Sequence, residues 1–416
     1  MARQGAKRGG ALNGMLIMMP LLRPAGFVDP RDSMQLNSRV IFHAAALACV
    51  FSGSAARAED VITIGHVAAT SGAIAHLGKD NENGAIMAVD QVNAKGLVIG
   101  GKRYRLKLQV EDDAADPKQG TAVAQKLVDA KVNGVIGHEN SGTSIPASRI
   151  YFAAGIPQIS PSASNPKYTR QGYNTAFRNV ANDEQLGAAL ARYAVQVGKA
   201  KRIAVIDDRT AYGKGLTDEF IKSVKAARSG TSIVAQQYTT DKASDFGAIL
   251  TAIKAAKPDL VFFGGMDAVA GPMLRQMKQL GIKANFMGGD GMCSDSVPRL
   301  AGDAMADGQV ICAEAGGVQP QQQKAMDDFR VAYKRKFGID VLTYAPYAYD
   351  ALLTMVAAMQ QAGSPDPAVY LPVLAKIRYK GVTGINAFDA RGDVKDGMLT
   401  IYTFKGGKRE RLTVMK

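Results

Sequence analysis

Val135–Ser148, VIGHENSGTSIPAS, together with Ile159–Pro166, ISPSASNP, is the part of this chain that best indicates its fold and function. Each stretch is a short apolar strand that runs into a loop of Ser, Gly and Asn, and the first continues as a helical pattern through Ala154. The free N–H groups and partial positive charge of a helix start favour an anion such as a carboxylate. The two loops therefore predict a site for a small anionic ligand. For either loop alone, ordinary helix capping by Ser and Asn is the alternative.

Strands and helices are expected to alternate along nearly all of residues 59–416. Strands are expected at 61–68, 105–110, 132–137, 158–160, 202–207, 232–238, 259–263, 285–287 and 309–313, and two strand-like runs follow at 384–388 and 399–404. Helices are expected at 77–95, at 117–131 with Asp116 as N-cap, after Thr143, and at 215–227, 245–257, 269–280, 321–337 and 346–361. This order is typical of parallel α/β sheets with right-handed crossovers.

Two similar halves are visible in this order. The apolar strands Val132–Ile136 and Asp259–Phe263 occupy similar places in each half. We therefore expect two Rossmann-like lobes with parallel-sheet cores rather than one large sheet. Ligands of such sheets bind beyond the carboxyl ends of the strands, so the cleft between the lobes is the expected site.

Residues 1–58 are interpreted as a pre-sequence. Met34–Ala58 has the features of a secretory signal: Arg39 precedes an apolar core, Val40–Gly53, and Ala56 and Ala58 supply small residues, so cleavage is expected after Ala58. The core is too short to span a bilayer. Translation could start at Met1 or at Met34, and the sequence leaves both open.

Charge and cysteine content change when this segment is removed. It carries seven basic and two acidic residues, so the formal charge falls from +14 to +9. The basic residues are spread over helix faces, and no nucleic-acid motif is present. Cys293 and Cys312 remain, and two cysteines in an exported protein suggest a disulfide worth about 3 kcal/mol, with two buried free thiols as the alternative.

Catalytic signals are few. The mature chain keeps only His66, His76 and His138, and none has metal-ligand spacing. The sequence contains no G-x-S-x-G elbow and no phosphate-binding loop of the G-x-x-x-x-G-K-[ST] type. His138 could act as a general base, but a structural histidine at a strand end is the preferred interpretation. No enzyme activity, cofactor or metal is expected.

At these loops the chain resembles the type I periplasmic binding proteins of ABC importers, in particular the leucine/isoleucine/valine-binding family. The resemblance covers essentially all of residues 59–416. It is carried by the order and spacing of several short motifs: SGAIA at 71–75, NAKG at 93–96, DDAADPKQ at 112–119, the VIGH…PAS block, ISPSASNP, AYGKG at 211–215, PMLRQ at 272–276 and FMGGDG at 286–291.

The resemblance implies which residues hold a zwitterionic amino acid. It implies that Ser141 and Ser164 hold the α-carboxylate, and that Ser162 offers its carbonyl to the ammonium. Asp290 would pair with that ammonium, and Tyr212 would close the cage from the second lobe. A buried charge is tolerated only when it is paired and hydrogen-bonded, which agrees with this set.

Several positions depart from the family pattern. Leu77 stands where the family has an aromatic over the ligand, and Met266 where a tyrosine lines the second lobe. Glu139 replaces the usual leucine of the side-chain pocket, so it either points to solvent or admits a polar or basic ligand. Asn140 is included among the expected ligand contacts. It also stands, with Ala115, where the family archetype has its disulfide, so the bridge here would be Cys293–Cys312.

The resemblance implies a periplasmic protein, monomeric, that captures an amino acid, first of all a branched-chain one, and delivers it to a membrane permease. The expected lobes are 59–181 plus 313–388 and 182–312 plus 389–416, joined by a three-strand hinge. Alternatives are another amino acid, an amide or a small aromatic acid as ligand, or a sensor subunit that presents ligand to a receptor. A secreted α/β enzyme that uses His138 or Asp290 as a base is the alternative from a different class.

Overall fold

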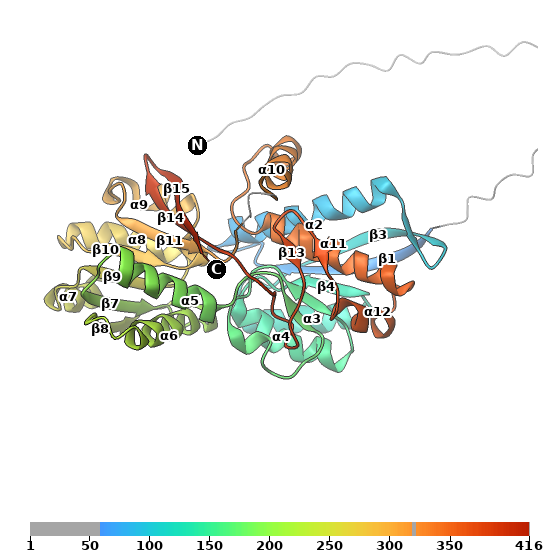
Figure 1. Ribbon diagram of the computed structural model, residues 1–416, viewed down its shortest axis with the longest axis horizontal. Helices are drawn as coiled ribbons and strands as arrows, with labels where there is room; N and C mark the ends of the chain where they lie inside the picture. The colour runs from blue at the N-terminus through green and yellow to red at the C-terminus, as the bar shows by residue number, and fades with distance from the viewer. Residues whose placement is uncertain (1–58, 318–321, 416) are drawn as a thin grey trace, which may run out of the picture. The chain divides into compact units, whose positions relative to one another are not determined.

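A computed structural model describes residues 59–317 and 322–415 of the chain (Figure 1). The expected signal segment, both candidate starts and the cleavage site after Ala58 lie outside the described residues, so those expectations stay predictions.

The first lobe is built on a six-stranded sheet with the order β2-β3-β1-β4-β5-β6. All neighbouring strands pair in parallel except β2, which is antiparallel to β3. Its strands are Asp60–Ala68 (β1), Leu97–Ile99 (β2), Lys102–Asp112 (β3), Gly134–Gly137 (β4), Gln158–Ser160 (β5) and Ala176–Arg178 (β6).

Helices cover both faces of this sheet, because successive strand side chains point to opposite faces. Ile64 and Ile136 pack under one helix group, whereas Val67 and Val135 pack under the other. The first group is Ala75–Lys95 (α2), Gln323–Phe337 (α10), Ala345–Ala362 (α11) and Pro367–Leu374 (α12); the second is Pro117–Asp129 (α3) and Ser141–Ala153 (α4). Asp116 caps α3 as expected, since its carboxylate accepts the N–H groups of Lys118 and Gln119.

The second lobe repeats the theme around a seven-stranded sheet, β15-β14-β11-β10-β9-β7-β8. Its strands are Arg202–Asp207 (β7), Ser232–Tyr238 (β8), Leu260–Gly264 (β9), Asn285–Gly288 (β10), Val310–Glu314 (β11), Leu399–Lys405 (β14) and Lys408–Met415 (β15). One face packs on Asp183–Arg192 (α5) and Ala211–Ala226 (α6); the other packs on Gly247–Ala255 (α7), Asp267–Gln279 (α8) and Ser296–Ala301 (α9). The expected disulfide, Cys293–Cys312, is present and lies in the second of these two cores.

Three details of the sequence prediction need correction. The cores are parallel as expected, but both sheets have antiparallel edges, since β2 and the β14–β15 hairpin turn back along their neighbours. The strand expected at 384–388 is only Ile385–Asn386 (β13), which pairs with Tyr379–Lys380 (β12) outside both main sheets. Helix α5 was not expected, although Asn182 and Gln185 form a capping box at its start.

The chain passes between the lobes three times: after β6, after β11 and before β14. These segments are hydrogen-bonded to one another. The N–H of Ala181 donates to the carbonyl of Ala315 (3.1 Å), and the N–H of Arg178 donates to the carbonyl of Gly392 (2.9 Å). The arrangement fits the expected three-strand hinge, whose exact boundaries remain a prediction.

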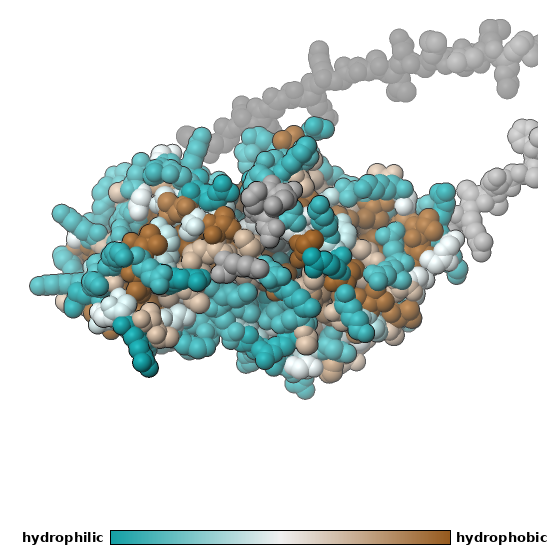
Figure 2. Space-filling view, in the orientation of Figure 1, coloured by the Kyte–Doolittle hydropathy of each residue, from teal (hydrophilic) through white to brown (hydrophobic). Residues whose placement is uncertain are grey.

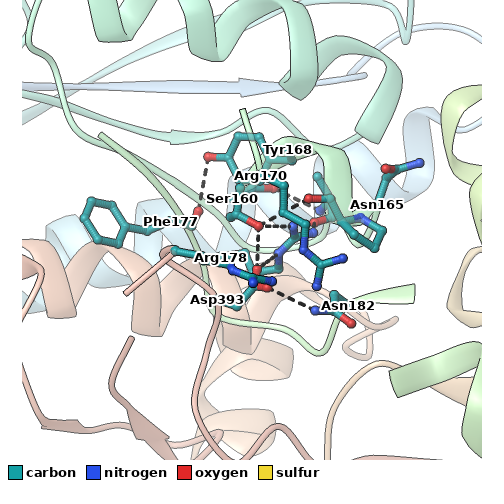
Figure 3. A network of polar contacts seen from close by, with 12 residues as sticks. Ser160, Asn165, Tyr168, Arg170, Phe177, Arg178, Asn182 and Asp393 are labelled. Atoms are coloured by element: carbon teal, nitrogen blue, oxygen red, sulfur yellow. Dashed lines mark hydrogen bonds and ion pairs between the residues drawn. The ribbon is translucent and has the colours of Figure 1, made fainter. Parts of the chain in front are cut away.

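A buried ion pair holds two of these crossings together (Figure 3). Arg178 is fully buried, and its Nε lies 2.6 Å from Oδ1 of Asp393. Asp393 also accepts from Thr169 Oγ1 (2.8 Å) and from Asn182 Nδ2 (3.0 Å). Burial favours the protonated form of Asp393, but Arg178, Thr169 and Asn182 outweigh this effect and lower its pKa.

The surface drawn in Figure 2 is mainly hydrophilic, with scattered apolar residues. Among the described residues, no helix has the length and apolarity needed to cross a bilayer.

Candidate functional site

A small cavity lies between the two lobes, at the carboxyl ends of the parallel strands. Eight of the nine residues expected around a ligand line it, and Tyr344 is the ninth lining residue. The first lobe contributes Leu77, Glu139, Asn140, Ser141, Ser162 and Tyr344; the second contributes Tyr212, Met266 and Asp290. Residues far apart in the chain therefore meet where ligands of such folds bind.

The first-lobe wall is the loop between β4 and α4. Asn140 is the N-cap residue of α4 and Ser141 is its first residue, so unpaired N–H groups of the first turn face this end of the lobe. The hydroxyl of Ser141 accepts the N–H of Asn165 (3.2 Å). The hydroxyl of Ser162 donates to the carbonyl of Glu139 (2.8 Å). These bonds join the two loops into one wall, which suits a carboxylate.

The second-lobe wall centres on Asp290, which is 2% exposed and follows β10. Its Oδ1 accepts the hydroxyl of Tyr212 (2.7 Å), and its Oδ2 accepts the hydroxyl of Tyr344 (3.0 Å). Burial raises the pKa of Asp290, while the two phenol donors oppose that rise. A cation in the cavity would restore the charged form.

Tyr344 is the one lining residue that the sequence did not reveal. It is the N-cap residue of α11, one position before the helix, and it is 5% exposed. Its only sequence signal is an aromatic residue near a helix start, which Tyr347 and Tyr349 share. Its role depends on the packing of α11 beside the second lobe, which local pattern does not encode.

Direct contacts across the cleft hold the lobes together in this structure. His76 Nε2 lies 2.7 Å from Oδ2 of Asp267, and Asn165 Nδ2 donates to the carbonyl of Ala211 (2.6 Å). Tyr344 and Asp290 form a third contact at the cavity itself. The conformation is therefore a closed one.

The sequence of residues 61–408 matches the family model described as periplasmic binding protein. A curated relative, Leu/Ile/Val-binding protein homolog 1 of Brucella abortus, is 36% identical over 371 residues, which cover 89% of this chain and 97% of the relative. The leucine-, isoleucine-, valine-, threonine-, and alanine-binding protein of Pseudomonas aeruginosa is 34% identical, with 86% and 94% coverage. The chain belongs to the periplasmic binding protein family.

Solved structures agree with this assignment. The branched-chain amino acid transporter substrate binding protein of Streptococcus pneumoniae, in complex with isoleucine, superposes with a TM-score of 0.77 at 27% identity, covering 86% of this chain and 99% of that one. The two-lobed architecture expected of a type I periplasmic binding protein is therefore confirmed.

One expected ligand contact of this periplasmic binding protein does not line the cavity, and its role stays a prediction. Ser164 is fully buried and is not among the lining residues. Asp183 is buried near it, and burial and repulsion from Asp290 raise the pKa of that carboxyl to about 8. The two residues are also joined through the backbone, since the N–H of Asp183 donates to the carbonyl of Ser164 (2.9 Å).

Glu139 does not point to solvent, so that interpretation from the sequence is wrong. It is 4% exposed and lines the cavity. Its Oε2 accepts the N–H of Ala69 (3.1 Å). Burial raises the pKa of Glu139 well above its ordinary value, and repulsion from Asp113 adds to the rise.

His138 is a structural residue in this periplasmic binding protein. It is fully buried, with Nδ1 2.8 Å from Oδ2 of Asp113 and Nε2 3.0 Å from the hydroxyl of Tyr151. It is not among the lining residues, so a ligand in the cavity does not reach its ring. Within residues 59–317 and 322–415, no group of three or more histidine, cysteine or carboxylate side chains could hold a metal ion.

Proposed function

We propose that this protein is a periplasmic solute-binding protein of an ABC importer that captures an amino acid between its lobes and presents it to a membrane permease. The observation that carries the proposal is the arrangement around one cavity: the start of α4 with Ser141 on one side, and Asp290 held by Tyr212 and Tyr344 on the other. The names of the relatives put branched-chain amino acids first among the ligands to test.

In this proposal the two walls bind the two charges of a zwitterion. The carboxylate lies at the N-terminus of α4, where N–H groups and the hydroxyl of Ser141 stabilise it. The ammonium pairs with Asp290 on the second lobe. Leu77 and Met266 supply apolar contact beside these polar groups. Because each wall belongs to a different lobe, a bound zwitterion stabilises the closed state and thereby drives hinge closure.

The proposal extends to location and to the mature chain. Residues 1–58 act as an export segment that is cleaved after Ala58, and the mature protein works in the periplasm as a monomer. The lobes are 59–181 plus 313–388 and 182–312 plus 389–416, and the hinge comprises the three crossings. A protein with this role binds its ligand without turning it over.

Isothermal titration calorimetry with a panel of amino acids tests the proposal. The protein is purified from the periplasm and stripped of ligand by unfolding and refolding. We expect one amino acid to bind per chain, and Asp290→Ala to lose at least about 100-fold in affinity, because an ion pair in a dry site is removed. Asp303→Ala, an exposed acid on the same lobe, is the matched control. A wild-type protein that binds no amino acid, or an Asp290→Ala variant with full affinity, would contradict the proposal.

A further inference from the structure

Glu139 carries an unused hydrogen-bonding group in the cavity. One carboxyl oxygen, Oε2, accepts the N–H of Ala69, but the other, Oε1, is buried and has no hydrogen-bond partner among the described residues. A buried polar atom without a partner is unfavourable, and in proteins nearly all buried polar atoms are hydrogen-bonded to the chain, to water or to a ligand. Because Glu139 lines the cavity, a bound ligand can supply the missing partner.

No lining hydroxyl, phenol or amide group is hydrogen-bonded to Oε1 of Glu139. The nine lining residues include two acids, Glu139 and Asp290, and no lysine, arginine or histidine. Asp290 already accepts two phenol hydroxyls. Oδ1 of Asn140, also at the cavity, is a second buried oxygen without a partner. The unmatched groups are thus acceptors, and they call for a ligand that donates.

The charges behind this wall favour a donor as well. Asp80, Asp113 and Asp267 all lie close enough to repel the charge of Glu139. Each has its own partners: backbone N–H groups of residues 342–345 for Asp80, His138 for Asp113, and His76 for Asp267. The potential at Glu139 is therefore negative, and it attracts the positive end of an N–H bond.

We propose that Glu139 sets the specificity of the site, and that the ligand is an amino acid whose side chain carries a nitrogen hydrogen-bond donor. This inference rests on the proposed function, because Asp290 still binds the α-ammonium and Ser141 the carboxylate. The side-chain nitrogen donates to Oε1 of Glu139, between the apolar surfaces of Leu77 and Met266. Two kinds of side chain carry such a donor: one with an ammonium group, as in ornithine, and one with an amide group, as in glutamine.

An aliphatic side chain would satisfy Glu139 in neither of its charge states. The ionised carboxylate would remain a buried anion without a counter-ion. The protonated acid would present an O–H without an acceptor. A site built to hydrogen-bond a substrate discriminates strongly against an analogue that lacks the bonding group, because the buried polar group is then left unpaired.

Isosteric ligands make the test sharp. Ornithine and norleucine differ only in a terminal ammonium against a methyl group, and glutamine and leucine are added. Affinities are measured by calorimetry for the wild-type protein purified from the periplasm and for Glu139→Leu and Glu139→Gln prepared in the same way. We expect ornithine or glutamine to bind wild type at least about tenfold more tightly than norleucine and leucine. Glu139→Leu should reverse that order.

Glu139→Gln distinguishes an ammonium ligand from an amide ligand. It also provides the test if Glu139→Leu does not fold. It keeps the shape but removes the charge, so an ammonium ligand should lose at least about tenfold while an amide ligand loses less. The inference is overturned if wild type prefers norleucine or leucine and the ratio of ornithine to norleucine affinity is the same in both variants as in wild type. If Asp290→Ala still abolishes binding in that case, the proposed function stands. Wild type that binds no amino acid overturns the inference together with the proposed function.

Discussion

The hydroxyl of Tyr344 donates to Oδ2 of Asp290 across 3.0 Å, and this bond joins the two lobes at the cavity. Tyr344 precedes α11 of the first lobe, whereas Asp290 follows β10 of the second. The acid proposed to bind the ligand ammonium is therefore completed by a residue of the opposite lobe. In the proposed function, ligand binding and lobe closure would be coupled through the same carboxylate.

Tyr344→Phe should weaken amino acid binding by about tenfold, because a hydrogen bond to a charged group is lost. The ring stays, so the protein should fold normally. Calorimetry measures the affinity. Tyr349→Phe is the control from the same helix, since its hydroxyl donates to Gln91 instead. Equal affinities for the two variants would show that the Tyr344 hydroxyl does not contribute.

Amino acid binding should weaken as the pH falls through the pKa of Asp290. Burial raises this pKa in the free protein, so the loss begins at a higher pH than for an ordinary aspartate. The ligand ammonium stabilises the ionised form, so binding near that pH should release protons. Calorimetry in two buffers with different ionisation enthalpies measures the release. Proton uptake, or an affinity that does not change down to about pH 4, would contradict this prediction.

Asp183→Asn should stabilise the ligand-free protein at neutral pH. Burial raises the pKa of Asp183 from 3.8 to about 8, so the folded state binds a proton more tightly than the unfolded chain. The stability due to this proton is complete below about pH 4 and is lost as the pH rises towards about 8. Asparagine does not titrate, so the variant does not lose this stability. At pH 8 its free energy of unfolding should exceed that of the wild-type protein by at least about 1 kcal/mol.

Urea denaturation at pH 4 and pH 8 measures the free energy of unfolding for both proteins. Asp207→Asn, at the partly exposed last residue of β7, serves as the control for a simple loss of charge. A difference between Asp183→Asn and wild type that is the same at both pH values would contradict the assigned titration.

Asp393→Asn should destabilise the protein by about 3–5 kcal/mol, because it leaves the buried guanidinium of Arg178 without its counter-charge. Arg178 also donates to the carbonyl of Ala163, in the loop after β5. Urea denaturation measures the effect. Asp328→Asn removes an exposed ion pair with Lys324 and should change stability by less than about 1 kcal/mol. Similar small changes in both variants would show that the buried pair is not needed.

The sequence predicted the architecture because the signals for it are local. Apolar strands such as Val132–Gly137 and amphipathic helices such as Pro117–Asp129 can be recognised from spacing and capping alone. Pairing direction at the sheet edges could not be recognised in this way. It depends on which strand lies beside β11, and β14 lies nearly 90 residues further along the chain.

Most of the cavity was also predictable, because its loops follow strands in a known order. Ser141, Ser162, Tyr212 and Asp290 all line the cavity as the resemblance implied. Ser164 does not line the cavity, since residues of one loop can point to different sides, and its role as a ligand contact stays a prediction. Tyr344 was missed because its contact with Asp290 forms only when two distant segments pack together.

Native mass spectrometry of the wild-type protein and of Asp290→Ala, both purified from the periplasm, tests whether Asp290 holds an amino acid in the cavity. We expect the wild-type protein to retain one amino acid per chain, identified by its mass, and Asp290→Ala to retain none. A wild-type adduct that is not an amino acid, or the same adduct at full occupancy in Asp290→Ala, would contradict this expectation.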